Sequence, residues 1–184
     1  MYYSCGHFFI RWSDIPVTQE TKDRIEQQAR AFLIKHNETK PPINPETLAQ
    51  REGLTVVYDY ILGNRVGELN RETKQIVVDE YLKNDLPYAH CVIAHELGHY
   101  VLNVGAALTA SAGKAPETSA DESELEANYF AHALLMPKPL VEKAVKKYNN
   151  KKETSFDTLI DYICYMFCVT ERKAKHRLEE CGLG

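Results

Sequence analysis

The stretch CVIAHELGHYVLN at residues 91–103 restricts the possible folds more than any other part of the chain. It places His95 and His99 four positions apart, with Glu96 between them. Residues i and i+4 lie on the same face of an α-helix, so both imidazoles can bind one ion if this stretch is helical. An apolar stripe offset from the histidines predicts a helix packed against a core; it consists of Ile93, Leu97 and Val101.

The residue types in this helix favour hydrolytic zinc chemistry. Catalytic zinc usually keeps three protein ligands and one water, and imidazole is a common ligand. Glu96 leans from the flank of the histidine face, where a carboxylate can accept the proton of a zinc-bound water, whose pKa the metal lowers toward about 7. Gly98 costs about 1 kcal/mol relative to alanine in a helix, which we interpret as a close approach of another backbone or of a substrate. The alternative is a structural helix whose histidines bind no metal.

A third ligand is expected from the carboxylate-rich segment DESELEANYFAHALLMP, which predicts a second long helix. Glu124 borders the apolar stripe of that helix on the side that it shares with Asn128. We therefore expect Glu124 to bind the ion and Asn128 to hydrogen-bond a ligand. Glu126 points away and is the weaker candidate, whereas Asp121 lies on the same side as Glu124.

Two further residues of the second helix could contribute to a site. His132 and Tyr129 follow Glu124 on the second helix and are candidate hydrogen-bond donors to a transition state, although a packed side chain is the commoner role. His90 falls on a different face from the histidine pair, so we expect it to be a surface or structural residue.

The rest of the chain predicts an α+β domain, in which a small three-stranded, largely antiparallel sheet packs with a helical bundle. The polar residues between the last two strands indicate a hairpin. Asn44 is a plausible cap for a short helix that begins at Pro45. The expected strands cover residues 54–61, 66–70 and 74–80, and the expected helices cover residues 21–37, 45–52, 87–102, 121–135, 140–148, 156–168 and 170–181.

Composition excludes several classes of function. The formal net charge of −4 gives no overall field that would attract nucleic acid or anionic lipid, and no apolar run is long enough to cross a membrane. The first residues lack the features of a signal peptide, so we expect a cytoplasmic protein. In that compartment cysteines are usually reduced and buried. The chain has five, none in a C-x-x-C pair: Cys5, Cys91, Cys164, Cys168 and Cys181.

The two segments IAHELGHYVL and ELEANYFAHALLMP together resemble the ImmA/IrrE family of zinc metallopeptidases. The resemblance implies a gluzincin-like arrangement in which His95, His99 and Glu124 bind one Zn²⁺ per chain and Glu96 is the general base. It also implies an antirepressor function, in which cleavage of a helix-turn-helix repressor relieves repression of a mobile-element, prophage or stress-response operon.

We expect a single, stand-alone metallopeptidase domain over residues 1–184. Within it we expect an irregular segment over about residues 1–20, a long flexible loop over 103–121, and a helical hairpin over 155–184. That hairpin is similar to a helix-turn-helix. Acidic residues nearly balance its basic ones, so direct nucleic-acid binding is not expected.

Two hypotheses about function follow. The first is an endopeptidase, for which the strand at 66–70 could be an edge to which a substrate peptide adds as a further strand. The second is a non-catalytic regulator that is stabilised by zinc and binds a repressor or DNA. Glu96 favours the first hypothesis, because a purely structural zinc site needs no base beside the metal.

Overall fold

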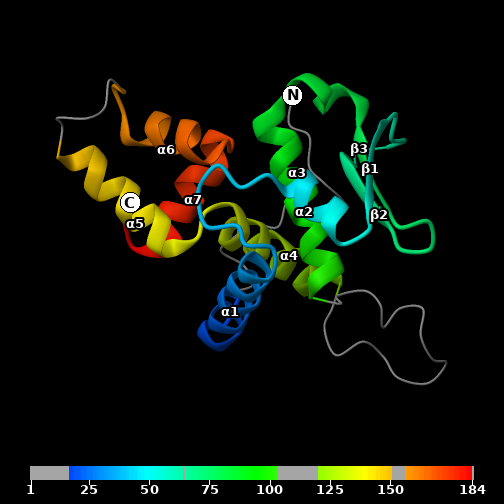
Figure 1. The fold of residues 1–184 in the computed structure, drawn as a ribbon, viewed down its shortest axis with the longest axis horizontal. Helices are drawn as coiled ribbons and strands as arrows, with labels where there is room; N and C mark the ends of the chain where they lie inside the picture. Colours follow the sequence, from blue (N-terminus) through cyan, green and yellow to red (C-terminus); the bar gives the residue numbers. More distant parts are fainter. Residues whose placement is uncertain (1–16, 64, 103–119, 151–155, 184) are drawn as a thin grey trace.

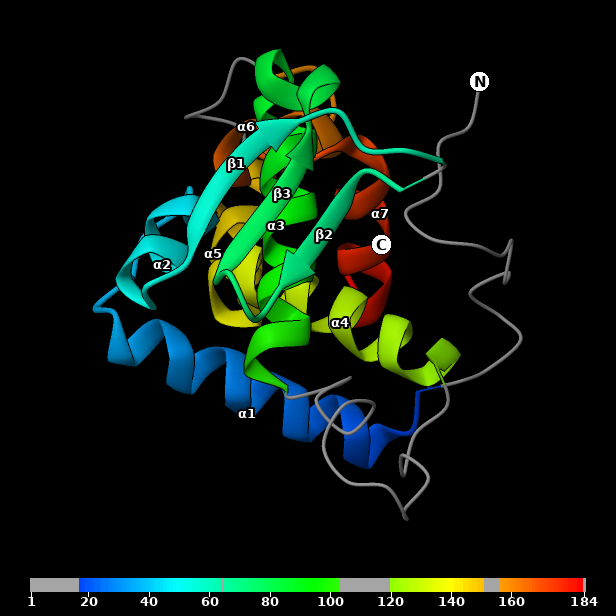
Figure 2. The same cartoon turned by 90° about the vertical axis from the view of Figure 1, so that its right-hand side faces the viewer.

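The computed structural model describes residues 17–63, 65–102, 120–150 and 156–183, which form an α+β fold (Figure 1). A small sheet lies at one side of the molecule, and helix α3 runs behind that sheet through the centre (Figure 2). The elements are α1 (Gln19–Lys35), α2 (Pro45–Arg51), β1 (Thr55–Asp59), β2 (Gly67–Asn70), β3 (Gln75–Asp79), the 3₁₀ helix η1 (Glu80–Asn84), α3 (Leu86–Val101), α4 (Ala120–Leu135), α5 (Lys138–Asn149), α6 (Leu159–Phe167) and α7 (Glu171–Cys181).

The first two helices begin at capping residues. The hydroxyl of Thr18 accepts a hydrogen bond from the backbone of Thr21 at the start of α1. Asn44 does the same for Thr47 at the start of α2, where Pro45 occupies the first turn, as the sequence predicts.

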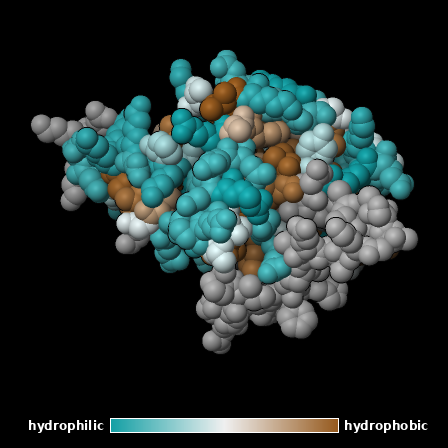
Figure 3. Space-filling view, turned by 90° about the horizontal axis from the view of Figure 1, so that it is seen from below, coloured by the Kyte–Doolittle hydropathy of each residue, from teal (hydrophilic) through white to brown (hydrophobic). Residues whose placement is uncertain are grey.

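Seen from below, the surface of the molecule is mostly hydrophilic with a few hydrophobic patches, because amphipathic helices turn their apolar sides inward (Figure 3).

The sheet is mixed, with the strand order β1-β3-β2. Strands β2 and β3 form the predicted antiparallel hairpin, but β1 pairs with β3 in parallel, so the expectation of a largely antiparallel sheet is wrong. The physical reason is the path of the chain. After β1, the chain crosses the end of the sheet and returns along the far edge as β2, and β3 then fills the space between them.

Helix α3 forms the centre of the core and contacts both the sheet and α4 (Figure 2). Ile93 and Leu97 have no exposed surface, which agrees with the predicted apolar stripe. Gly98 lies against the backbone of α4, since a Cβ atom there would come within 2.8 Å of the Ala127 carbonyl oxygen. The close approach of a second backbone at Gly98 is therefore confirmed.

Helices α6 and α7 lie within the range where the sequence predicts a C-terminal hairpin, and they lie beside α5 (Figure 1). Much of the expected irregular start and loop, namely residues 1–16 and 103–119, lies outside the described residues. Among the described residues, α1 begins at Gln19 and α4 begins at Ala120. In the part of the chain that the structure describes, no helix combines the length and apolar character that a membrane crossing requires.

The cysteines with described positions are all free thiols. Cys91 is buried, as expected, whereas Cys164, Cys168 and Cys181 are only partly buried. Burial raises the pKa of the Cys91 thiol, so this side chain behaves as a small apolar group of the core. Cys5 lies outside the described residues.

Candidate metal centre

Three side chains converge where α3 crosses α4. The Nε2 atoms of His95 and His99 lie 3.0 Å apart. The carboxylate of Glu124 approaches both, with Oε2 3.1 Å from His95 Nε2 and Oε1 3.2 Å from His99 Nε2. Among the described residues, these three form the group of possible ligands whose donor atoms all lie within 4.8 Å of one another.

The donor set of this cluster fits zinc. Two imidazole nitrogens and one carboxylate oxygen are a known set for catalytic zinc, with bonds of about 2.0–2.2 Å. In a tetrahedral site such bonds place two donors about 3.3 Å apart, close to the separations between His95, His99 and Glu124. The side chain of His95 is 6% exposed and that of Glu124 is 45% exposed. One side of the cluster therefore faces solvent, as a catalytic site with an open coordination position requires.

The cluster is electrostatically coupled. Burial acts to raise the pKa of the Glu124 carboxyl, but hydrogen bonds and charge from His95 and His99 outweigh it, so the pKa is lowered. Burial acts to lower the pKa of the His99 imidazole, but Glu124 and, to a smaller extent, Glu96 outweigh it and the pKa is raised. Glu124 is thus held ionised, which is the form that a metal binds.

Glu96 is buried on the flank of α3 that faces strand β2. Its side chain occupies space that Gly67 leaves open, because a Cβ atom on Gly67 would come within 2.9 Å of Glu96 Oε1. Burial raises the pKa of the Glu96 carboxyl; the imidazoles of the cluster lower it and the charge of Glu124 raises it further. Gly67 was not among the predicted site residues, although an isolated glycine in a strand is a known signal of close backbone approach.

Asn128 lies one turn after Glu124 on α4. Its side-chain amide donates to the backbone carbonyl of Glu124 at 2.9 Å and accepts from Lys173 Nζ of α7 at 3.0 Å. Asn128 therefore links the backbone that carries Glu124 to α7, rather than binding the side chain of a possible ligand.

The structure places Tyr129 and His132 in a different cluster from Glu124. The Tyr129 hydroxyl donates to Glu26 Oε1 at 3.3 Å, and His132 Nδ1 lies 2.8 Å from Glu180 Oε1. Complete burial lowers the pKa of His132 to about 4. Both side chains face α1 and α7, so neither lies where it could donate to a substrate at the histidine pair.

Arg177 is at the centre of this second cluster, a role that no local sequence pattern indicates. The guanidinium is 1% exposed and pairs with Glu26 Oε1 at 2.7 Å and with Glu180 Oε2 at 3.3 Å. It also donates to the carbonyl of Met136 at 2.8 Å, just beyond the end of α4. Arg177 thus joins α1, α4 and α7 through buried polar contacts.

The remaining acidic and histidine candidates lie apart from the histidine pair. Glu126 is buried and pairs with Arg24 of α1 at 2.5 Å. His90 is 4% exposed, and burial lowers its pKa, which fits the expected structural role. The side chain of Asp121 lies outside the described residues.

Comparisons with known proteins agree with this arrangement. A family model described as the IrrE N-terminal-like domain, Peptidase M78, matches residues 49–179, which include α3 and α4. Among solved structures, a Mycobacterium tuberculosis transcriptional regulator has a similar fold, with a TM-score of 0.61 and 18% identity over 87% of this chain and 50% of that one. The chain therefore spans half the length of that regulator. A search of curated proteins found no match.

Proposed function

Because this chain belongs to the IrrE N-terminal-like domain family, Peptidase M78, we propose that it is a zinc-dependent endopeptidase. The observation that carries the proposal is the placement of a buried carboxylate beside three converging donors. His95, His99 and Glu124 would hold the ion, and Glu96 lies next to them without belonging to the set. A purely structural zinc site favours four closed ligands and needs no such carboxylate.

When bound, zinc supplies Lewis acidity toward a peptide carbonyl and increases the acidity of a water molecule. Different parts of the fold position the three donors. The two histidines are held one turn apart by α3, and Glu124 is brought to them by the close contact of α4 with Gly98. The exposed side of Glu124 leaves room for a substrate to approach.

Glu96 acts as the general base. Burial raises the pKa of its carboxyl, so the carboxylate is a better proton acceptor than an exposed glutamate. It takes the proton of the water that attacks the peptide carbonyl carbon, and it then delivers that proton to the amine nitrogen as the C–N bond breaks. Gly67 keeps the space that this carboxylate needs.

We propose that the substrate is a protein, and specifically a helix-turn-helix transcriptional repressor, as the family resemblance implies. Strand β2 is an outer strand of the described sheet and begins at Gly67, beside Glu96. A substrate segment that adds to this edge would run past the proposed base with its backbone hydrogen-bonded to β2. This path supports cleavage within an extended segment of the repressor.

The basic residues of the C-terminal hairpin support a protein substrate rather than nucleic acid. Arg177 is buried, Lys173 donates to Asn128, and Lys175 pairs with Glu171 on the same helix. Arg172 is the remaining Lys or Arg of α7 and is exposed, and one exposed guanidinium falls short of the row of cations that phosphate binding requires.

The test compares the wild-type protein with Glu96→Gln. Metal content is measured after purification and zinc reloading, and cleavage is assayed on a repressor encoded beside this chain's own gene. We expect about one zinc per chain in both proteins and cleavage by the wild type alone. Glu126→Gln, which removes a carboxylate from the same helix as Glu124 but outside the cluster, should keep both zinc and cleavage.

The two hypotheses about function predict different outcomes. If both proteins bind zinc and neither cleaves, the chain is a zinc-stabilised regulator rather than a peptidase. If Glu96→Gln cleaves as fast as the wild type, Glu96 is not the base.

A further inference from the structure

A cleft of about 360 Å³ lies at the C-terminal end of α3. This volume is at the small end for ligand sites and suits one side chain better than a cofactor. The walls come from the end of α1, the end of α2, the turn between β2 and β3, and the last turn of α3. The lining residues are Phe32, Lys35, Glu52, Arg71, Tyr100 and Val101.

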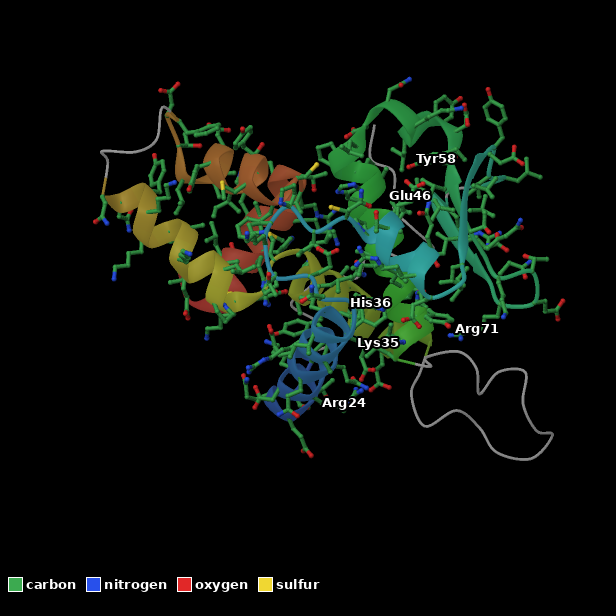
Figure 4. The ribbon with its side chains drawn as sticks, in the orientation of Figure 1. Arg24, Lys35, His36, Glu46, Tyr58 and Arg71 are labelled. Atoms are coloured by element: carbon green, nitrogen blue, oxygen red, sulfur yellow. The ribbon has the colours of Figure 1, made fainter. Side chains whose placement is uncertain are left out.

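The acidic group in the cleft already has partners. Glu52 Oε1 accepts from Lys35 Nζ at 2.5 Å and lies 2.6 Å from His36 Nε2. Burial acts to raise the pKa of the Glu52 carboxyl, but these two neighbours outweigh it and the pKa is lowered. Glu52 therefore stays ionised, and its charge is compensated by Lys35 and His36, which lie at the end of α1 (Figure 4).

Arg71 supplies the opposite wall, from the turn that follows β2 (Figure 4). One of its nitrogens, Nη2, donates to the carbonyl oxygen of His99 at 2.5 Å, and its guanidinium lies 6.0 Å from the centre of the Tyr100 ring. No carboxylate in the part of the chain that the structure describes forms an ion pair with Arg71. A guanidinium has five N–H donors in a fork that matches a carboxylate, so Arg71 is held in place with donors to spare.

The position of Arg71 connects the cleft to the proposed metal centre. Its partner, the His99 carbonyl, belongs to one of the three converging residues. Arg71 directly follows β2, which begins beside Glu96 and is four residues long. An extended peptide advances about 3.3 Å per residue, so one chain can reach both Glu96 and Arg71 with a few residues between them.

We propose that this cleft is a specificity subsite in which Arg71, backed by Tyr100, binds an aspartate or glutamate side chain of the substrate a few residues from the cleaved bond. The proposal rests on the proposed endopeptidase function. Phe32 and Tyr100 contact the methylene groups of the acidic side chain, and the pairing of Glu52 with Lys35 and His36 keeps its charge from repelling that side chain.

The test is a cleavage profile on peptides made by digesting a soluble cell extract with a protease that cuts after aromatic residues. The zinc-loaded full chain is incubated with this mixture, and new termini are identified by mass spectrometry, with Glu96→Gln as background. We expect acidic residues at one position near the cleaved bond to be enriched up to about fivefold, the range for a solvent-exposed ion pair. Arg71→Lys should keep this preference, and Arg71→Glu should replace it with a preference for Lys or Arg.

Lys74→Glu is the matched control, because it makes the same change in sign on the same turn outside the cleft. Its profile should equal that of the wild type. A wild-type profile without acidic enrichment, or an Arg71→Glu profile equal to that of the wild type, overturns the subsite. If Arg71→Glu only weakened the packing of α3, cleavage of all peptides would fall, but the preference for one charge at the subsite would not reverse.

Binding separates the subsite from the peptidase function. If the wild type cleaves no more than Glu96→Gln, the endopeptidase proposal fails. The subsite is then tested by measuring the binding of three peptides, each labelled with an uncharged dye, to zinc-loaded Glu96→Gln. These differ at one position only, which is Glu, Gln or Lys. Tighter binding of the Glu peptide, reversed when Arg71→Glu is added, supports the subsite; equal binding of all three peptides refutes it.

Discussion

Replacing Gly98 with alanine tests whether the contact between α3 and α4 positions Glu124. In an exposed helix this change adds about 1 kcal/mol of stability, because alanine has the higher helix propensity. At Gly98 the new Cβ would lie 2.8 Å from the Ala127 carbonyl oxygen and 3.0 Å from the Ala127 Cα, where ordinary contact begins at 3.4 Å. The obstacle is backbone, so no change of rotamer relieves it, and the helices must separate by about 0.6 Å.

The expected magnitudes follow from this displacement. Overpacking of a core costs about 1–3 kcal/mol, and a rigid obstacle belongs in the upper part of that range. After the gain in propensity, we expect Gly98→Ala to lower the free energy of unfolding by about 1–2 kcal/mol. Ligand distances in a metal site tolerate about 0.2 Å, less than the movement of α4, so zinc affinity should fall about tenfold or more.

Urea denaturation gives the free energy of unfolding, and competition with a chelator gives the zinc affinity. Ala144→Gly in α5 is the control, because it loses about 1 kcal/mol of helix propensity in a helix that does not carry the cluster. It should lower stability without changing zinc affinity. If Gly98→Ala were more stable than the wild type and bound zinc equally well, the contact would not be positioning Glu124, and our reasoning would be refuted.

Three further predictions concern other contacts in the structure. Gly67→Ala places a Cβ 2.4 Å from Val92 Cγ1 and 2.9 Å from Glu96 Oε1, so we expect cleavage to slow about tenfold to a hundredfold while zinc content measured by atomic absorption is unchanged. Arg177→Ala leaves Glu26 without its buried partner and should cost about 3–5 kcal/mol in urea denaturation. His132→Asn should remove part of the acid sensitivity of the fold. Burial lowers the pKa of His132 from about 6.5 to about 4, so the wild type loses up to about 3 kcal/mol as the pH falls between those values.

Each of these predictions has a contrary outcome. Loss of zinc together with activity in Gly67→Ala would mean that the substitution disturbs the ligands rather than the base. Arg24→Ala removes a more exposed ion pair with Glu126 and should cost less than about 1 kcal/mol; an equal cost for Arg177→Ala would contradict the importance of burial. A wild-type stability that stays constant between pH 6.5 and pH 4 would show that His132 is not the acid-sensitive group.

The convergence of His95, His99 and Glu124 is predictable from sequence because it depends mainly on local geometry. Helical spacing puts the histidines on one face, and the apolar stripe of α4 decides which of its carboxylates faces them. The choice of Glu124 over Glu126 follows from the same reasoning, and the structure places Glu126 against Arg24 instead. Capping at Asn44 is predictable for the same reason, because the signal lies within a few residues.

The features that sequence reasoning missed depend on residues far apart in the chain. Nothing near β1 indicates that it pairs in parallel with β3, because that pairing is decided by where the chain crosses the sheet. From sequence alone, Arg177 would be predicted to be an exposed basic residue. In the structure it is buried against Glu26, which lies far from it in the chain. Tyr129 and His132 have suitable chemistry for a catalytic role, but helix α4 turns them toward α1 and α7.

Helix α1 precedes the segment that the family model matches, yet it packs against α4 and two of its side chains form ion pairs with that segment. Arg24 pairs with Glu126 on α4, and Glu26 pairs with Arg177 on α7. A fragment cut to residues 49–179 would expose the apolar side of α4 and leave the guanidinium of Arg177 buried without Glu26. We therefore expect an expression fragment that begins before Thr18 to be more stable than one cut at the boundaries of sequence similarity.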